Sequence, residues 1–233
     1  MTATTHDIHD YQQRLLAIDT GHICDALSHL GCVSPQLPDV IRPFTKAVKF
    51  AGPAATIRLV RTRSVTEPRR LIELIDRHIH PGTVVVVDAD GCTEWSVFGA
   101  RMALRTKLQG GLGAVVNGSI RDIEAMSDLE FPVHALGRSL LASEGRFRSI
   151  AMDAEVTIQG VLIAGGDWLV GDSSGICVIP QAMLDEVVRL AEERERIDQD
   201  TLQSILAGGT LADGHRHFED DLKAHDHRHL GDD

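Results

Sequence analysis

Arg121 and Asp122 are adjacent residues that combine a cationic and an anionic side chain suited to binding a small acid and a metal ion. A guanidinium group can hold a carboxylate through two parallel hydrogen bonds. An aspartate supplies the hard oxygen ligand that Mg²⁺ or Mn²⁺ takes from proteins, usually through one or two carboxylates with several waters retained. The same dipeptide is also typical of a surface ion pair or a helix-capping aspartate, so the pair alone leaves both interpretations open.

Two glycine-containing loops are expected to lie near a ligand. One is predicted over residues 88–91, after a strand that ends at Val87, and the other over residues 117–122. In α/β sheets, sites form beyond the carboxyl ends of strands. Asp88 and Asp90 could hold metal-bound waters or could simply form turns. A helix beginning near Gly99 would direct free N–H groups and the positive end of its dipole towards an anion.

The middle of the chain predicts an α/β unit. The run Thr83–Asp88 is rich in valine and is typical of a strand that is buried on both faces. Helices are expected over residues 97–109 and 122–128. Short strands are expected over residues 113–117, closed by Gly118, and around 132–135. The order strand–helix–strand–helix–strand predicts a largely parallel sheet.

The flanking segments predict further strands and helices. Residues 8–30 indicate two short helices, the second beginning near Thr20 and stopping at Gly31. Residues 47–60 indicate two strands separated by a break at Gly52–Pro53, and residues 68–79 indicate a helix with Pro68 at its start. Residues 154–180 predict several short strands with tight turns at 165–166 and 172–175. A long helix follows Pro180 and ends at Gly208–Gly209.

Composition narrows the classes of partner. Acidic side chains outnumber basic ones, 34 to 23, and the formal net charge is −11. This charge repels phosphate backbones, so no nucleic-acid partner is expected. A small anionic substrate would need a local positive group, which Arg121 provides. No apolar run approaches the ~20 residues of a membrane span, so no membrane partner is expected.

The cysteines and the N-terminus favour a cytoplasmic protein. The four cysteines, Cys24, Cys32, Cys92 and Cys177, form neither a Cys-x-x-Cys pair nor a zinc-binding spacing, so reduced thiols are expected. The N-terminus lacks the basic flank and apolar segment of a signal peptide.

Several ordered motifs resemble those of the RraA-like family, which includes the 4-hydroxy-4-methyl-2-oxoglutarate and 4-carboxy-4-hydroxy-2-oxoadipate aldolases. The resemblance covers roughly residues 18–211. It rests on Gly110–Asp122 (GGLGAVVNGSIRD) followed by Phe131–Ala135, and on shorter pieces in the same order: Asp25–Leu27 with Gly31, Gly52–Ala54, Pro81–Val84, and Gly166–Asp167 through Gly171–Asp172, Gly175 and Pro180.

The resemblance implies an α/β fold: a layered, swivelling β/β/α domain with a partly parallel central sheet and a long C-terminal helix. It also implies a homo-oligomer, either a trimer or a dimer of trimers. In the family's aldolases an Arg holds the pyruvate carboxylate and an Asp binds a divalent metal (Mg²⁺ or Mn²⁺), roles that fall on Arg121 and Asp122. Backbone amides that complete the carboxylate pocket fall on Arg101 and Met102, next to Gly99. The metal would act as a Lewis acid and stabilise the enolate left after carbon–carbon cleavage or decarboxylation.

The sequence departs from the family pattern at two positions. The aldolases carry an acidic residue after the glycine that matches Gly99, and Ala100 stands there. They also place a Glu from a neighbouring subunit near the metal, and the matching residue is Asp198, with Glu195 one turn earlier. Because the acidic residue is thought to help handle protons through water, its absence puts the standard aldol substrate in doubt.

We therefore expect a metal-dependent lyase, an aldolase or decarboxylase, that acts on a small 2-oxo acid. Arg121, Asp122 and Asp198 are its candidate catalytic residues. The alternatives are an unusual substrate for the same metal centre, or a non-catalytic protein like RraA itself, which inhibits an endoribonuclease. Residues 1–211 are expected to form the domain and residues 212–233 a polar tail rich in His and Asp. The tail could chelate a metal, although a solvated or subunit-clasping segment is the simpler interpretation.

Overall fold

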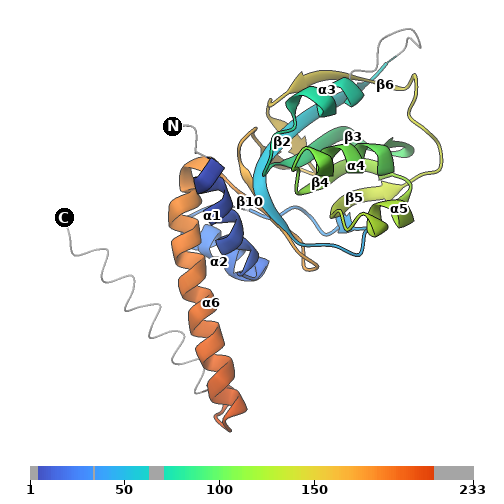
Figure 1. Ribbon diagram of the computed structural model, residues 1–233. Coiled ribbons are helices and arrows are strands. Elements are labelled where there is room, and N and C mark those ends of the chain that lie inside the picture. Colours follow the sequence, from blue (N-terminus) through green and yellow to red (C-terminus); the bar gives the residue numbers. More distant parts are fainter. Residues whose placement is uncertain (1–4, 34, 63–70, 213–233) are drawn as a thin grey trace.

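The computed structural model describes residues 5–33, 35–62 and 71–212. A sheet lies at its centre, with α3, α4 and α5 on one side and a separate layer of α1, α2 and α6 on the other (Figure 1). Pro68 and the His-rich tail beyond residue 212 lie outside the described residues, so the predicted domain boundary stays a prediction. No helix in the described ranges is both long enough and apolar enough to cross a membrane.

The sheet is mixed, with a parallel centre. Its strands follow the order β1-β5-β4-β3-β2-β9-β10, and β6 pairs with β2. Strands β2 to β5 are parallel neighbours, and the other pairs are antiparallel. The bounds are β1 Arg42–Pro43, β2 Phe50–Arg61, β3 Val84–Phe98, β4 Gly113–Ile120, β5 Val133–Arg138, β6 Phe147–Met152, β9 Trp168–Gly171 and β10 Ile176–Ile179. A separate hairpin joins β7 Val156–Ile158 to β8 Val161–Ile163. The predicted fold class is confirmed.

The helices lie close to the predicted positions. Their bounds are α1 Thr5–Leu16, α2 Thr20–His29, α3 Leu71–His78, α4 Ala100–Leu108, α5 Ile123–Asp128 and α6 Leu184–Leu206, the last preceded by a 3₁₀ turn, Gln181–Met183. Gly31 and Gly208 adopt positive φ (83° and 95°) just after α2 and α6. This backbone conformation costs glycine little and ends a helix, so both predicted stops are confirmed.

The valine run at the start of β3 packs on both faces of the sheet. Val85 and Val87 belong to the core shared with α3, α4 and α5. Val84 and Val86 belong to another core that includes the β7–β8 hairpin. All four are fully buried, and burying one such side chain contributes roughly 1.5–3 kcal/mol. The two-sided burial predicted from the sequence is therefore confirmed.

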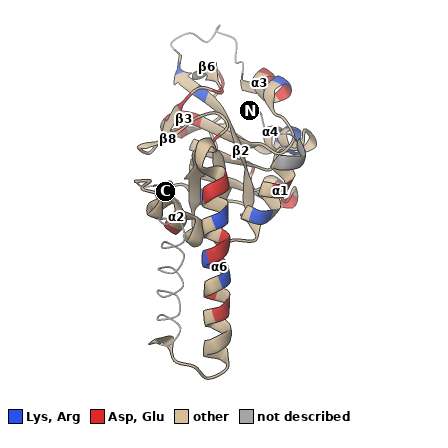
Figure 2. Ribbon diagram, turned by 90° about the vertical axis from the view of Figure 1, so that its left-hand side faces the viewer, with Lys and Arg blue, Asp and Glu red and all other residues tan. Residues whose placement is uncertain are grey.

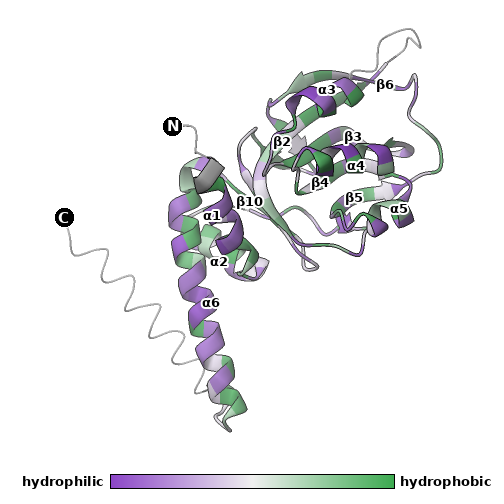
Figure 3. Ribbon diagram, viewed as in Figure 1, coloured by the Kyte–Doolittle hydropathy of each residue, from purple (hydrophilic) through white to green (hydrophobic). Residues whose placement is uncertain are grey.

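Helix α6 is amphipathic. Leu184, Val187, Val188, Ala191 and Ile197 are buried, and all but Ile197 belong to the core that α6 shares with α1 and α2. Hydrophobic and hydrophilic residues alternate along its visible length (Figure 3). Acidic and basic residues are interspersed along the helix (Figure 2). This pattern is typical of a helix with one buried stripe and one solvated face.

The predicted break at Gly52–Pro53 is wrong, because β2 continues through both residues. Phe50–Pro53 pair with β9 and Ala54–Arg58 pair with β3, so the strand changes partner at this point. A Cβ on Gly52 would lie 2.4 Å from the carbonyl oxygen of Gly82. The glycine therefore marks a close approach of two backbone segments.

The loop predicted over residues 88–91 is also wrong, because β3 runs on to Phe98. Asp90 and Gly91 adopt positive φ (55° and 67°), and the register against β4 shifts between Asp88 and Cys92. The strand thus bends at an irregularity and continues. The buried carboxylate of Asp88 accepts hydrogen bonds from the Asp90 N–H (3.0 Å) and Asn117 Nδ2 (2.8 Å), which supports the turn interpretation.

The end of β4 and the start of α4 also differ from the predicted positions. Strand β4 passes through Gly118 and ends at Ile120, although the sequence suggested an end at Gly118. Helix α4 begins at Ala100 and not near residue 97, because Val97 and Phe98 remain in β3 and Gly99 is the N-cap of the helix. Consequently Arg121 and Asp122 directly follow a buried strand.

His134 on β5 predicts a pH dependence of stability. Its ring is fully buried, and Nε2 lies 3.0 Å from the Val48 carbonyl oxygen, so Nε2 must carry the hydrogen. Nδ1 is buried without a hydrogen-bond partner among the described residues. Burial lowers the pKa of His134 below 6.5, despite the opposing effects of the Val48 hydrogen bond and of Asp172.

Because the folded protein disfavours the protonated ring, the unfolded chain binds more protons below about pH 6.5. The contribution of neutral His134 is complete above that pH and is lost as the pH falls towards the lowered pKa. We expect the free energy of unfolding to decline from pH 7.5 to 5.5 more steeply in the wild type than in His134→Gln. Exposed His80→Gln serves as the control and should follow the wild type. Equal slopes in all three proteins would contradict the prediction.

Candidate active site

The candidate site lies where two parallel strands end. Phe98, the last residue of β3, pairs with Ile120, the last residue of β4. The Arg121 N–H donates to the Phe98 carbonyl oxygen (3.1 Å). This register brings Gly99 and the start of α4 beside Asp122 and the start of α5, at the edge of a parallel sheet where ligand sites form.

Asp122 occupies a special backbone position. It caps α5 in the left-handed region, with φ 60° and ψ 41°, which aspartate tolerates better than most residues. Its Oδ2 accepts a long hydrogen bond from the Ala100 N–H (3.4 Å) and lies 3.7 Å from Arg121 Nε. The side chains of Arg121 and Asp122 remain 37% and 46% exposed. Both are therefore held in place but accessible to a ligand.

Gly99 allows the close approach of Asp122. A Cβ at this position would lie 2.8 Å from Asp122 Oδ2 and 3.4 Å from Arg121 Cγ. Its φ of −166° is extended backbone that any residue can adopt. Space, and not backbone conformation, therefore requires glycine here.

A hollow of about 60 Å³ adjoins these residues. It is far smaller than the roughly 300–1,000 Å³ of sites for drug-sized ligands, so a molecule of a few non-hydrogen atoms fits it best. Its charged lining residues are Arg101, Arg121 and Asp122. The remaining lining residues are Ile72, Ser96, Val97, Phe98, Gly99, Met102, Ala142 and Ser143. Two guanidinium groups against one carboxylate favour an anion.

The start of α4 offers fewer free amides than the sequence suggested. The Met102 N–H already donates to the Gly99 carbonyl oxygen (3.0 Å), and the Ala100 N–H points to Asp122. The Arg101 N–H belongs to the first turn, where amides have no acceptor within the helix. Arg101 is therefore the better placed of the two predicted amide donors.

Among the described residues that line the hollow, Asp122 is the one with a carboxylate. Ala100, where the family's aldolases carry an acidic residue, has none and packs against the core. Within the described ranges, no group of three or more His, Cys, Asp or Glu residues is arranged to hold a metal ion. One half-exposed carboxylate beside an anion site still fits Mg²⁺ or Mn²⁺, which keep several waters and bind through one or two carboxylates and the substrate.

Asp198 and Glu195 do not join this site within one chain. Both lie on α6, in the helical layer away from α4 and α5 (Figure 1). His22 Nε2 lies 3.6 Å from Glu195 Oε2 and 3.9 Å from Asp198 Oδ2. Hydrogen bonds from Gln199 and the Asp19 N–H outweigh the effect of burial and lower the pKa of Glu195. Asp198 can reach Asp122 only from another copy of the chain.

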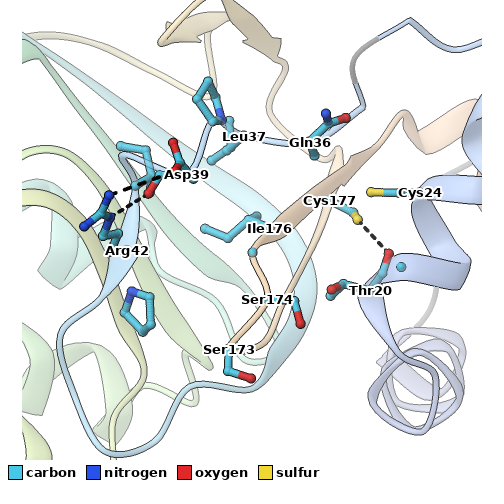
Figure 4. A pocket seen from close by; sticks show the side chains of 15 residues that line it. Thr20, Cys24, Gln36, Leu37, Asp39, Arg42, Ser173, Ser174, Ile176 and Cys177 are labelled. Carbon is cyan, nitrogen blue, oxygen red and sulfur yellow. Dashed lines mark hydrogen bonds and ion pairs between the residues drawn. The ribbon is translucent and has the colours of Figure 1, made fainter.

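A second cavity, which the sequence did not indicate, lies between α2 and the β9–β10 turn (Figure 4). Its volume is about 700 Å³, and segment 36–43 forms another wall. Asp172 shapes this turn, since its carboxylate accepts hydrogen bonds from Thr20 Oγ1 (3.0 Å) and the Ser174 N–H (2.6 Å). The sequence signal for this turn was its Asp-Ser-Ser-Gly composition, which indicated structure and not a cavity.

Comparison with known proteins places these features in context. Residues 20–178 match the family described as RraA-like, aldolase/RraA. A protein of Halalkalibacterium halodurans, provisionally named 4-hydroxy-4-methyl-2-oxoglutarate aldolase, is 30% identical over 205 residues, covering 85% of this chain and 93% of that protein. Protein DlpA of Legionella pneumophila is 32% identical over 209 residues, and the match spans 85% of this chain but only 32% of DlpA.

Among solved structures, RraAS2 of Streptomyces coelicolor superimposes with a TM-score of 0.74 at 26% identity, covering 82% of this chain and 96% of RraAS2. It is described as an unusual member of the RNase ES inhibitor RraA protein family. The similar proteins thus include a provisionally named aldolase and a member of a ribonuclease-inhibitor family.

Proposed function

The chain belongs to the RraA-like family, and from this premise we propose that it is a divalent-metal-dependent lyase, an aldolase or decarboxylase, of a small 2-oxo acid. The observation that carries the proposal is the convergence of Arg121, Asp122 and the first turn of α4 on one small hollow. The provisional name of the Halalkalibacterium halodurans relative supports the same reaction class.

Arg121 is proposed to bind the substrate carboxylate through its guanidinium fork. The Arg101 N–H and the positive end of the α4 dipole add to the attraction. Asp122 would hold Mg²⁺ or Mn²⁺, which when bound supplies Lewis-acid polarisation of the substrate's keto oxygen.

Ala100 has no group that accepts or donates a proton. In an aldol cleavage the proton lost by the substrate's hydroxyl group, and the proton gained by the enolate, must therefore pass through water or another side chain. We propose that a homo-oligomer brings Asp198 of a neighbouring copy to this place. Two largely exposed residues, Leu140 and Leu141 (94% and 62% exposed), precede Ala142 and Ser143 in the lining of the hollow. Apolar side chains exposed beside a site are typical of surfaces that another chain covers.

Pyruvate release tests the proposed reaction. The purified protein would receive oxaloacetate or 4-hydroxy-4-methyl-2-oxoglutarate with Mg²⁺, with Mn²⁺ or with excess EDTA, and reactions without protein would correct for metal-catalysed decay. We expect pyruvate release only with metal. If the rate with each substrate equals that of the protein-free control, the proposed substrate class is wrong.

Gly99→Ala tests whether the spacing beside Asp122 matters. The added methyl group would displace the carboxylate, and misplacement of a reacting group by about 1 Å can cost on the order of 100-fold in rate. We expect at least a tenfold loss of pyruvate release with unchanged circular dichroism. The matched control is Gly21→Ala, where nothing lies within 4 Å of the added Cβ. Equal activity of the two variants would contradict the assigned role.

A second candidate function is inhibition of an endoribonuclease by binding. The description of RraAS2 and the net charge of −11 favour it, since acidic surfaces suit a basic RNA-binding region. Pull-down with an RNase E-type enzyme, repeated with charge-reversed surface variants, would test it. Capture that weakens with charge reversal and persists in Asp122→Asn would support binding independent of the hollow.

A further inference from the structure

Two thiols far apart in the sequence face each other beside the large cavity. Cys24 lies on α2 and Cys177 on β10, and their sulfur atoms point towards one another (Figure 4). Cys177 Sγ donates its hydrogen to the Thr20 carbonyl oxygen (3.2 Å) at the start of α2, the helix that carries Cys24. Both cysteines are free, so the contact brings two reactive groups together without a covalent link.

The cavity gives small molecules access to this pair. Both cysteines are among its lining residues, and its volume of about 700 Å³ greatly exceeds that of a peroxide. Cys24 is partly exposed, whereas Cys177 is 1% exposed. The two thiols therefore differ in exposure, and an oxidant from solvent reaches Cys24 more readily than the buried Cys177.

We propose that Cys24 and Cys177 form a reversible redox modification site, in which hydrogen peroxide converts the pair to an intramolecular disulfide. This inference is independent of the proposed lyase reaction, since neither thiol lines the hollow at Arg121 and Asp122.

The chemistry balances in two steps. The Cys24 thiolate attacks one peroxide oxygen, the O–O bond breaks, and hydroxide leaves, which makes Cys24 a sulfenic acid. Cys177 sulfur then attacks the sulfur of Cys24 and displaces its hydroxyl group, while the Cys177 proton completes the departing water. Overall two thiols and one peroxide yield one disulfide and two waters, so the thiols are oxidised and the peroxide is reduced.

The surroundings assign the two roles. Cys24 is the more exposed of the two thiols. The neighbouring Cys177 side chain lowers the pKa of Cys24, although burial and the charges of Asp25 and Asp172 oppose this effect. The neighbouring Cys24 side chain and burial raise the pKa of Cys177. Because the thiolate is the nucleophile and Cys24 is the more accessible thiol, Cys24 is the site of first attack and Cys177 is the resolving thiol.

The disulfide would tie α2 to β10 across a long stretch of chain. Closing so long a loop restricts the unfolded chain and stabilises the fold, by an amount that corresponds to a rise in melting temperature of roughly 5–15 °C. The cross-link would also fix the wall of the cavity that the two residues share.

Mass spectrometry tests the proposal on the full-length protein. After treatment with hydrogen peroxide and alkylation of remaining thiols, we expect two of the four cysteines to escape alkylation. A cross-linked peptide should join Cys24 to Cys177 and disappear on reduction with dithiothreitol. Cross-links between other cysteines or between chains, or irreversible oxidation of Cys24 beside an alkylated Cys177, would overturn the proposal.

Single variants provide the matched controls. Cys32→Ser and Cys92→Ser should still form the cross-link, and Cys24→Ser and Cys177→Ser should not. In Cys177→Ser the reaction should stop at the sulfenic acid of Cys24, which dimedone traps. Cys177→Ala repeats the test should serine at this buried position impair folding. Absence of the dimedone adduct from folded Cys177 variants would also overturn the proposal.

Discussion

Asp122→Asn is expected to reduce metal-dependent pyruvate release by about 100- to 1,000-fold. The change keeps the size of the side chain but removes the negative charge that would hold the cation, and a Lewis-acid contribution of several kcal/mol corresponds to this range. Asparagine also tolerates the left-handed backbone that this position requires. The fold should therefore survive, and circular dichroism with thermal unfolding would check this.

Asp128→Asn is the matched control for this variant. Asp128 is an exposed aspartate at the other end of α5, outside the lining of the hollow. It should retain wild-type turnover. Turnover by Asp122→Asn equal to that of this control would show that the carboxylate has no part in the reaction.

Arg121→Lys is expected to raise KM for the 2-oxo acid by roughly 10- to 100-fold with a smaller change in kcat. Lysine keeps the charge but loses the planar fork, and charge-assisted hydrogen bonds contribute about 1.5–3 kcal/mol each. A carboxylate contact that is already made in the ground state affects substrate binding more than the chemical step. Steady-state kinetics would therefore show a larger change in KM than in kcat.

The control is Arg105→Lys. Arg105 lies on α4, close to the site in sequence, but its Nε donates to Asp76 (2.6 Å) in a half-exposed ion pair. Replacement there should leave both kinetic constants unchanged, because such pairs contribute little. An unchanged KM in Arg121→Lys would place the substrate carboxylate elsewhere.

Local sequence signals predicted much of the fold. The valine run at 84–87 predicted a strand covered on both faces, and Gly31 and Gly208 predicted the ends of two helices. The errors arose where strand pairing continued through residues that usually indicate a turn or a break. Gly91 suggested a loop and Gly52–Pro53 a break, yet pairing with neighbouring strands carries the backbone through both places. Strand β6 was missed altogether, since residues 147–152 lack clear alternation between polar and apolar side chains.

The candidate site was partly predictable for a related reason. Arg121 and Asp122 follow a buried strand, and in parallel sheets that position alone places side chains at the ligand-binding edge. The contact between Gly99 and Asp122 depends on the register of β3 and β4, which the sequence did not define. The pairing of Cys24 with Cys177 joins residues from opposite ends of the chain. Motif spacing contains no signal for such a contact.

Anomalous diffraction from crystals containing Mn²⁺ and oxalate tests the central claim most directly, because oxalate resembles the planar enolate of pyruvate. The claim predicts a manganese peak roughly 2.0–2.3 Å from a carboxylate oxygen of Asp122. It also predicts an oxalate carboxylate within about 2.7–2.9 Å of the Arg121 guanidinium. A manganese peak elsewhere, with Asp122 and Arg121 contacting neither ion, would contradict it.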